Sequence, residues 1–315
     1  MVEYVKVKMV EYVKGPPPDR WHWNKNCTLY PRAVAKTRLR RPNKDLCDEC
    51  QNLEKRVKHI RDVSRYKKVE EIMRQNVATI TPESSMAEAA RIMGERHIGS
   101  LIVTKYETPV GIVTERDLLS KVLAQGKDPA KEKVEEVMSY PLITIGPTAK
   151  IKEAAQIMIQ KKGRLAVFDV VKLVGIVTAS DLIRSLPEVS ETEVKVDDFM
   201  TKHVVMVDEK TPVAKIITIM GEKRIGSVIV THECEPFGIF TERDLLTAFL
   251  VERKPLAAEV GKEASSPLIT ATIGTSIHDA AVTMAMKHIR RLPITRDGKL
   301  VGIITARDLV EAYAT

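Results

Sequence analysis

One eight-residue motif occurs four times in this chain and constrains its fold more than any other feature. It consists of Gly, two apolar residues, Thr, two further residues, Asp and Leu, and its copies end at Leu118, Leu182, Leu245 and Leu309. The motif aspartates are separated by 64, 63 and 64 residues. A period this constant indicates one structural unit that is repeated four times.

The composition is that of a soluble globular protein, with 44% hydrophobic residues in a chain of 315. We find no apolar run of the length that crosses a bilayer and no charged-then-apolar signal segment. The sequence therefore predicts a cytoplasmic protein without a membrane partner.

Each repeat shows the same order of apolar patterns, which predicts β-α-β-β-α. In the first repeat the predicted elements are an opening helical turn at 69–73, strands at 78–81, 100–104 and 110–114, and helices at 85–97 and 117–123. In the fourth, Asp297-Gly298 predicts a tight hairpin. A sheet of three short strands is poorly covered alone, so we expect the repeats to pack in pairs.

Three repeats open on a similar segment that ends in methionine. The segments are Val69-Glu-Glu-Ile-Met73, Val134-Glu-Glu-Val-Met138 and Val196-Asp-Asp-Phe-Met200, whereas Val260-Gly-Lys-Glu-Ala264 lacks the methionine. Together with the eight-residue motif, which closes each repeat and is called the closing motif below, these segments resemble tandem cystathionine-β-synthase (CBS) domains of the archaeal type, from Val69 to the C-terminus. The resemblance implies an α/β (α+β) fold with repeats at 69–128, 129–190, 191–255 and 256–315, paired into two Bateman modules.

The resemblance also implies a ligand. Bateman modules bind adenine nucleotides (AMP, ADP or ATP) or other adenosyl ligands in clefts between two repeats, where the motif aspartate holds the ribose and the threonine contacts phosphate. Those roles fall on Thr114 and Asp117, Thr178 and Asp181, Thr241 and Asp244, and Thr305 and Asp308. The residues agree, since a strand-to-helix junction favours anions and a carboxylate can accept from two hydroxyls. The alternative is that these residues only cap helices.

Arginines beside the motif aspartates indicate which of the four clefts bind nucleotides best. Arg116, Arg243 and Arg307 precede the motif aspartates of repeats 1, 3 and 4, whereas repeat 2 has Ser180. We therefore expect the clefts of Asp117 and Asp244 to be the better nucleotide sites, followed by that of Asp308. The alternative for each arginine is a solvated surface charge.

The basic charge is concentrated before the repeats. Residues 1–68 hold 18 Lys and Arg against 8 Asp and Glu, whereas residues 69–315 hold 32 against 34. Neither helical nor strand periodicity is present from Trp21 to Lys44, but aromatic and basic residues alternate there, which suits stacking on RNA bases and pairing with phosphates. The candidate RNA-binding residues are Trp21, Trp23, Tyr30, Arg32, Lys36, Arg38, Arg40, Arg41 and Lys44.

The same segment holds a candidate zinc site. Cys47 and Cys50 form a C-x-x-C pair, Cys27 lies 20 residues before it, and His22 or His59 could complete a tetrahedral Zn²⁺ shell. The alternative is a reduced thiol pair. The sequence thus predicts an extended basic arm at 1–68, with or without zinc.

The repeats leave no room for a catalytic domain, and no P-loop, G-x-S-x-G or H-E-x-x-H motif occurs, so we expect no enzyme. One hypothesis is a sensor of adenine nucleotides whose basic arm binds ribosomal RNA and holds ribosomes idle, as a hibernation factor does, when energy is low. The other is an adenosyl-ligand-sensing adaptor that controls a separate enzyme, transporter or DNA site. Either could form a homodimer through its CBS modules.

Overall fold

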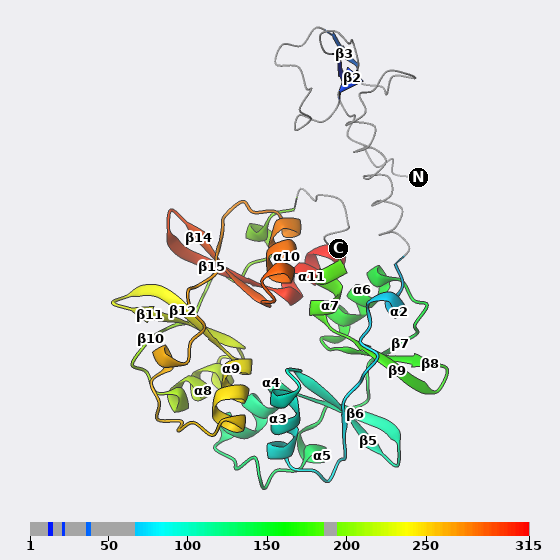
Figure 1. Cartoon of the computed structure of the whole chain (residues 1–315), viewed down its shortest axis with the longest axis vertical. Helices are drawn as coiled ribbons and strands as arrows, with labels where there is room; N and C mark the ends of the chain where they lie inside the picture. Colours follow the sequence, from blue (N-terminus) through cyan, green and yellow to red (C-terminus); the bar gives the residue numbers. More distant parts are fainter. Residues whose placement is uncertain (1–11, 15–20, 23–35, 39–66, 186–193, 315) are drawn as a thin grey trace. The chain divides into compact units, whose positions relative to one another are not determined.

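The computed structural model describes residues 12–14, 21–22, 36–38, 67–185 and 194–314 (Figure 1). The chain divides into two compact units, one of residues 1–65 with 188–190 and one of residues 66–187 with 191–315. In the first unit, β1 (Tyr12–Lys14) pairs antiparallel with both β2 (Trp21–His22) and β3 (Lys36–Arg38). The last two strands depart from the prediction for residues 21–44, because strands of two and three residues are too short to leave a periodic pattern.

The second unit contains the four repeats, and each follows the predicted β-α-β-β-α order. Repeat 1 consists of α2 (Val69–Ile72), β4 (Thr79–Ile80), α3 (Met86–Glu95), β5 (Ser100–Lys105), β6 (Thr108–Thr114), α4 (Glu115–Asp117), the π-helical η1 (Leu118–Val122) and the 3₁₀-helical η2 (Leu123–Gln125). Repeat 2 consists of α5 (Val134–Val137), β7 (Thr144–Ile145), α6 (Ile151–Lys161), β8 (Leu165–Asp169), β9 (Lys172–Val177) and α7 (Ala179–Ser185).

The second half of the unit repeats this order. Repeat 3 consists of the 3₁₀-helical η4 (Val196–Asp198), β10 (Met206–Asp208), α8 (Val213–Glu222), β11 (Ser227–His232), β12 (Glu235–Thr241), α9 (Glu242–Asp244) and the π-helical η5 (Leu245–Val251). Repeat 4 consists of the 3₁₀-helical η6 (Val260–Lys262), β13 (Ala271–Thr272), α10 (Ile277–Met286), β14 (Arg291–Arg296), β15 (Lys299–Thr305) and α11 (Ala306–Ala314).

Each repeat contains one sheet of three strands. The first strand runs parallel to the second, and the second pairs antiparallel with the third in a hairpin. The predicted hairpin of repeat 4 turns at Asp297 and Gly298, whose φ angles of 50° and 77° are the positive values that a two-residue turn of this kind requires. Each sheet packs apolar residues of one face against the helices of its repeat.

The long helix of each repeat covers this core. In α3, the Ser85 hydroxyl accepts a hydrogen bond from the backbone N–H of Glu88 and caps the first turn. Met86, Ala89, Ala90 and Met93, spaced by three or four along one face, are buried as the sequence predicts. The amphipathic pattern therefore fixes which face of the helix meets the sheet.

Neighbouring repeats exchange their opening segments. Arg74, which follows α2 of repeat 1, pairs with Ile176 in β9 of repeat 2, and Ser139 of repeat 2 pairs in return with Ile112 in β6. Repeats 3 and 4 make the same exchange through Thr201 with Ile303 and Ser265 with Ile239. This reciprocal pairing joins repeats 1 and 2 into one module and repeats 3 and 4 into another.

The exchange explains why the closing motif begins with glycine. A Cβ atom on Gly175 of repeat 2 would come within 2.6 Å of the Met73 sulfur of repeat 1. Gly111 faces Met138 and Gly302 faces Met200 in the same way, whereas Gly238 faces Ala264. The methionine and the glycine of the two motifs are thus packing partners across each module, and repeat 4 lacks the methionine without losing the contact.

Helices join the two modules. Helices α6 and α7 of repeat 2 pack against α11 and α10 of repeat 4 in one continuous core, and α3 and η1 of repeat 1 pack against η5 and α8 of repeat 3 (Figure 1). Contacts thus run from repeat 1 to 2, to 4, to 3 and back to 1 within one chain. Within the described residues no helix has the length and apolar character to span a membrane.

Candidate functional site

The threonine and aspartate of each closing motif form a cap at the strand-to-helix junction. In repeat 1 the Asp117 Oδ2 atom accepts hydrogen bonds from the Thr114 backbone N–H at 3.0 Å and from its hydroxyl at 2.6 Å. The same two contacts recur in the other three repeats. The cap that the sequence offers as an alternative is therefore present in every repeat, and it occupies one carboxylate oxygen.

The second oxygen distinguishes the repeats. Asp117 Oδ1 lies 2.7 Å from the Lys121 ammonium, and Asp181 Oδ1 accepts from Arg74 Nε at 2.9 Å and from Arg184 at 3.3 Å. The Oδ1 atoms of Asp244 and Asp308 have no hydrogen-bond or ion-pair partner within the described residues. They alone among the four keep an acceptor for a ligand hydroxyl.

Burial acts on these two carboxylates. Desolvation raises the pKa of Asp244 above its ordinary value, against the lowering effect of hydrogen bonds from Thr241 and of two nearby arginines. Desolvation likewise raises the pKa of Asp308, partly offset by its bonds to Thr305. In the ligand-free chain, the hydrogen bonds and neighbouring charges therefore offset only part of the desolvation of the two carboxylates.

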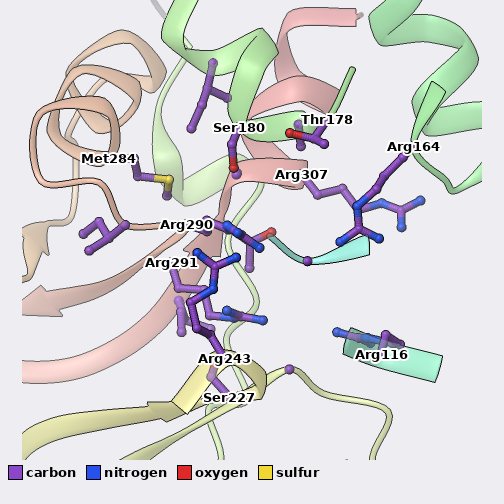
Figure 2. A pocket seen from close by; sticks show the side chains of 18 of the residues that line it. Arg116, Arg164, Thr178, Ser180, Ser227, Arg243, Met284, Arg290, Arg291 and Arg307 are labelled. Atoms are coloured by element: carbon purple, nitrogen blue, oxygen red, sulfur yellow. The ribbon is translucent and has the colours of Figure 1, made fainter. Parts of the chain in front are cut away.

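A cavity of about 600 Å³ lies where the four repeats meet (Figure 2). Its walls include the residues just before β5, β8, β11 and β14, together with the motif turns of repeats 2 and 4. Ten cationic side chains line it: Arg74, Arg116, Lys162, Arg164, Arg184, Arg224, Arg243, Arg290, Arg291 and Arg307. No aspartate or glutamate is among the lining residues, although residues 69–315 carry more acidic than basic side chains.

The arginines come from all four repeats and point toward one another. Figure 2 shows Arg164, Arg243, Arg307 and the consecutive Arg290 and Arg291 approaching the same space from repeats 2, 3 and 4. The pKa of Arg290 is lowered to about 10, mainly by desolvation and further by Arg243, Arg164 and Arg291. Desolvation also lowers the pKa of Arg164. Ten cations around one cavity, two of which are desolvated, favour a bound anion.

Two buried glutamates lie behind this wall. Glu115, which is 4% exposed, accepts from Arg243 at 3.2 Å and from Arg290 at 3.5 Å. Glu242, which is 9% exposed, lies 2.7 Å from Arg116 Nε and accepts from Arg291 at 3.2 Å. The contact with Arg116 has the distance of an ion pair but not the geometry of a hydrogen bond. Glu242 Oε1 therefore accepts no hydrogen bond from the described residues.

The structure brings together part of the predicted nucleotide-binding set. Arg116, Arg243 and Arg307 line the cavity with Thr178 and Thr305, whereas Thr114, Thr241 and the four aspartates lie outside its wall. Sequence reasoning missed Glu115 and Glu242, although the contrast of Thr-Glu-Arg-Asp with Thr-Ala in repeats 2 and 4 marks them. It also missed Arg74, Arg184 and Lys162, which no motif identifies.

The candidate zinc and RNA residues are mostly outside the described part of the chain. Cys27, Cys47, Cys50 and His59 lie there, as do Trp23, Tyr30, Arg32, Arg40, Arg41 and Lys44. For His22, Trp21, Lys36 and Arg38 the structure describes the backbone, in β2 and β3. Among the described residues no group of three or more His, Cys, Asp or Glu could hold a metal ion.

Comparison with known proteins places these features in a family. The CBS domain model matches residues 69–124, 134–188, 196–251 and 257–315. Protein MJ1404 of Methanocaldococcus jannaschii, which is uncharacterized, is 30% identical over 266 residues, or 78% of this chain; the chain spans 62% of that protein's length.

Two solved structures are similar. The first is MJ1225 of M. jannaschii, described as a proposed archaeal homologue of γ-AMPK; it has 22% identity and a TM-score of 0.67, over 79% of this chain and 100% of that one. The second is an uncharacterized Pyrococcus horikoshii protein, with 25% identity and a TM-score of 0.56, over 78% and 99%. The family match covers most of the chain and includes all four repeats. The chain therefore belongs to the CBS domain family.

Proposed function

We propose that this protein is a non-enzymatic sensor of adenine nucleotides. The observation that carries the proposal is the cavity, whose wall presents ten cationic side chains and no carboxylate in a repeat region that is otherwise slightly acidic. Phosphate groups are the anions that arginine clusters hold best, because guanidinium groups can donate two parallel hydrogen bonds. AMP, ADP and ATP supply such groups together with a ribose for the motif aspartates.

The hydrogen bonds favour a different ranking of the clefts from that of the sequence. We assign ribose binding first to Asp244 and Asp308, because their Oδ1 atoms remain available. In the clefts of Asp117 and Asp181, a ribose would first have to displace Lys121 or Arg74. Family membership and the likeness of fold to a protein described as a proposed homologue of γ-AMPK support this class of ligand.

Titration calorimetry with AMP, ADP, ATP and adenosine tests the proposal. The Asp244→Asn and Asp308→Asn double variant should lose about 10- to 100-fold in nucleotide affinity, because each carboxylate accepts from ribose more strongly than an amide does. Asp169→Asn, at the exposed end of β8, is the matched control and should bind as the wild type does. Unchanged affinity in the double variant would reduce these aspartates to helix caps.

The basic segment 1–68 supports a finer proposal, that the sensor acts on ribosomal RNA or the ribosome as a hibernation factor. It rests on the charge and aromatic content of that segment, with or without bound Zn²⁺. A chain lacking residues 1–68 should no longer co-sediment with ribosomes at low salt, and the intact chain should detach as salt rises. Co-sedimentation that survives the deletion would favour the adaptor hypothesis, in which the repeats, as a monomer or homodimer, contact a separate enzyme, transporter or DNA site.

A further inference from the structure

We propose that Glu115 and Glu242 are internal counter-anions that determine how many phosphate charges the cavity accepts. The inference rests on the proposed function, in that it takes the cavity as the place where phosphates bind. It adds two residues that set the preference among ligands of different charge, and neither residue belongs to the wall of the cavity.

The two glutamates occupy equivalent positions in repeats 1 and 3. Each directly follows the motif threonine, where repeats 2 and 4 carry Ala179 and Ala306. Because those two repeats form the same strand-to-helix junction with alanine, the turn itself does not require a carboxylate there. The fold of repeats 1 and 3 therefore does not by itself explain the presence of the two glutamates.

Their contacts cross from one module to the other in a reciprocal way. Glu115 of repeat 1 binds Arg243 of repeat 3, and Glu242 of repeat 3 binds Arg116 of repeat 1. Arg290 and Arg291 of repeat 4 add one further contact each. Two carboxylates thus hold four of the arginines that line the cavity.

The chain makes room for these pairs with glycine. Gly99 and Gly226 directly precede β5 and β11, and a Cβ atom on them would lie 2.7 Å and 2.9 Å from a carboxylate oxygen of Glu115 and Glu242. In repeats 2 and 4 the residues directly before β8 and β14 are Arg164 and Arg290. Repeats 1 and 3 supply the internal anions, and repeats 2 and 4 supply additional cations.

Buried charges interact strongly, so each glutamate has two effects on the cavity. It stabilises the arginines in the ligand-free chain, and it cancels one positive charge that would otherwise attract a ligand phosphate. An incoming phosphate competes with the glutamate for the same guanidinium groups. The cancellation weighs more for a ligand with more negative charge, so the glutamates discriminate against polyphosphates.

Inorganic anions test this at the cavity without a nucleoside. Orthophosphate, pyrophosphate and tripolyphosphate would be titrated into the full chain and into Glu115→Gln and Glu242→Gln. We expect the ratio of tripolyphosphate to orthophosphate affinity to rise roughly fivefold or more in each variant, because one unit of negative charge is removed near the ligand. Thermal unfolding without ligand should occur at lower temperature, since the arginines lose their partner.

Three comparisons make the outcome decisive. Glu95→Gln removes an exposed carboxylate that is paired with Arg91 on the surface of α3, and its affinity ratio should match the wild type. Glu115→Asp keeps the charge and should restore a wild-type ratio. If Glu115→Gln does not fold, Glu242→Gln remains, and its side chain already has one oxygen without a hydrogen bond.

A ratio of tripolyphosphate to orthophosphate affinity that stays unchanged in the variants would overturn the inference. If all three inorganic anions also bound equally more weakly, the glutamates would only position the arginines. The proposed function can fail separately. If the variants give the expected ratios with inorganic anions but the chain binds no adenine nucleotide, the role of the two glutamates stands and the nucleotide-sensing function does not.

Discussion

Met73 of repeat 1 lies directly against Gly175 of repeat 2, with its sulfur 2.6 Å from the position that a Cβ atom on that glycine would take. The contact links the opening segment of one repeat to the closing motif of its neighbour. The two most recognisable features of the sequence are therefore the two sides of one packing contact.

Enlarging Gly175 should destabilise the first module. Gly175→Ala forces a methyl group toward the Met73 sulfur and should cost about 1–3 kcal/mol in the free energy of unfolding. Gly238→Ala is the matched control, because the Cβ atom would lie 3.2 Å from the smaller Ala264, so its loss should be less. Thermal unfolding measures both, and Met73→Ala should relieve part of the strain in Gly175→Ala. Equal losses at Gly175 and Gly238 would contradict the contact.

Freeing Asp117 should create an additional nucleotide site. Lys121→Met removes the ammonium that lies 2.7 Å from Asp117 Oδ1 and leaves that atom available, as it is in Asp244. Calorimetric stoichiometry should rise by about one nucleotide per chain, because each free carboxylate oxygen can accept from one ribose. Lys131→Met, which removes an exposed lysine, should leave the stoichiometry unchanged.

Asp244 and Asp308, whose Oδ1 atoms lack a partner in the described part of the chain, should make stability depend on pH. The pKa of Asp244 and of Asp308 is raised in the folded chain, so the folded state binds their protons more tightly than the unfolded state does. Their favourable contribution is complete below the ordinary Asp pKa of about 4 and is lost as the pH rises through the folded pKa. The Asp244→Asn and Asp308→Asn double variant should therefore unfold about 1–3 °C above the wild type at pH 7. That gain should disappear near pH 4; a gain that grows on acidification would reverse the assigned sign.

Arg290 should matter to the ligand more than to the fold. Its guanidinium group is desolvated and repelled by three neighbouring arginines, with Glu115 as its one carboxylate contact among the described residues. Arg290→Gln should lower affinity for AMP about tenfold, because a charge-assisted bond to phosphate is lost, and should change the unfolding temperature little. Arg296→Gln, in the exposed hairpin of repeat 4, is the control and should bind AMP normally.

The order of elements could be predicted from the sequence because the same pattern is written four times. The burial of Met86, Ala89 and Met93 follows from their spacing along one helix face. The glycine and methionine motifs were visible too, but their contact was not, since Met73 and Gly175 are separated by a complete repeat. Spacing within one repeat cannot reveal an exchange between two.

The site was predictable only in its local part. Thr241 and Asp244 adjoin in the sequence, so their cap could be foreseen, whereas Lys121 and Arg74 reach two of the motif aspartates from positions that no motif marks. Glu115 and Arg243 are far apart along the chain and meet because helices of repeats 1 and 3 pack together. The availability of each carboxylate is thus a property of tertiary structure.

The exchange of opening segments also limits how such a chain can change in length. Each repeat both gives a segment to its neighbour and receives one, so removal of a single repeat would leave one donor without an acceptor and one acceptor without a donor. Gain or loss of both repeats of one module leaves the exchange in the other module intact. Duplication and deletion in a lineage of these proteins are therefore expected to keep the number of repeats even, with one pair of repeats as the smallest change.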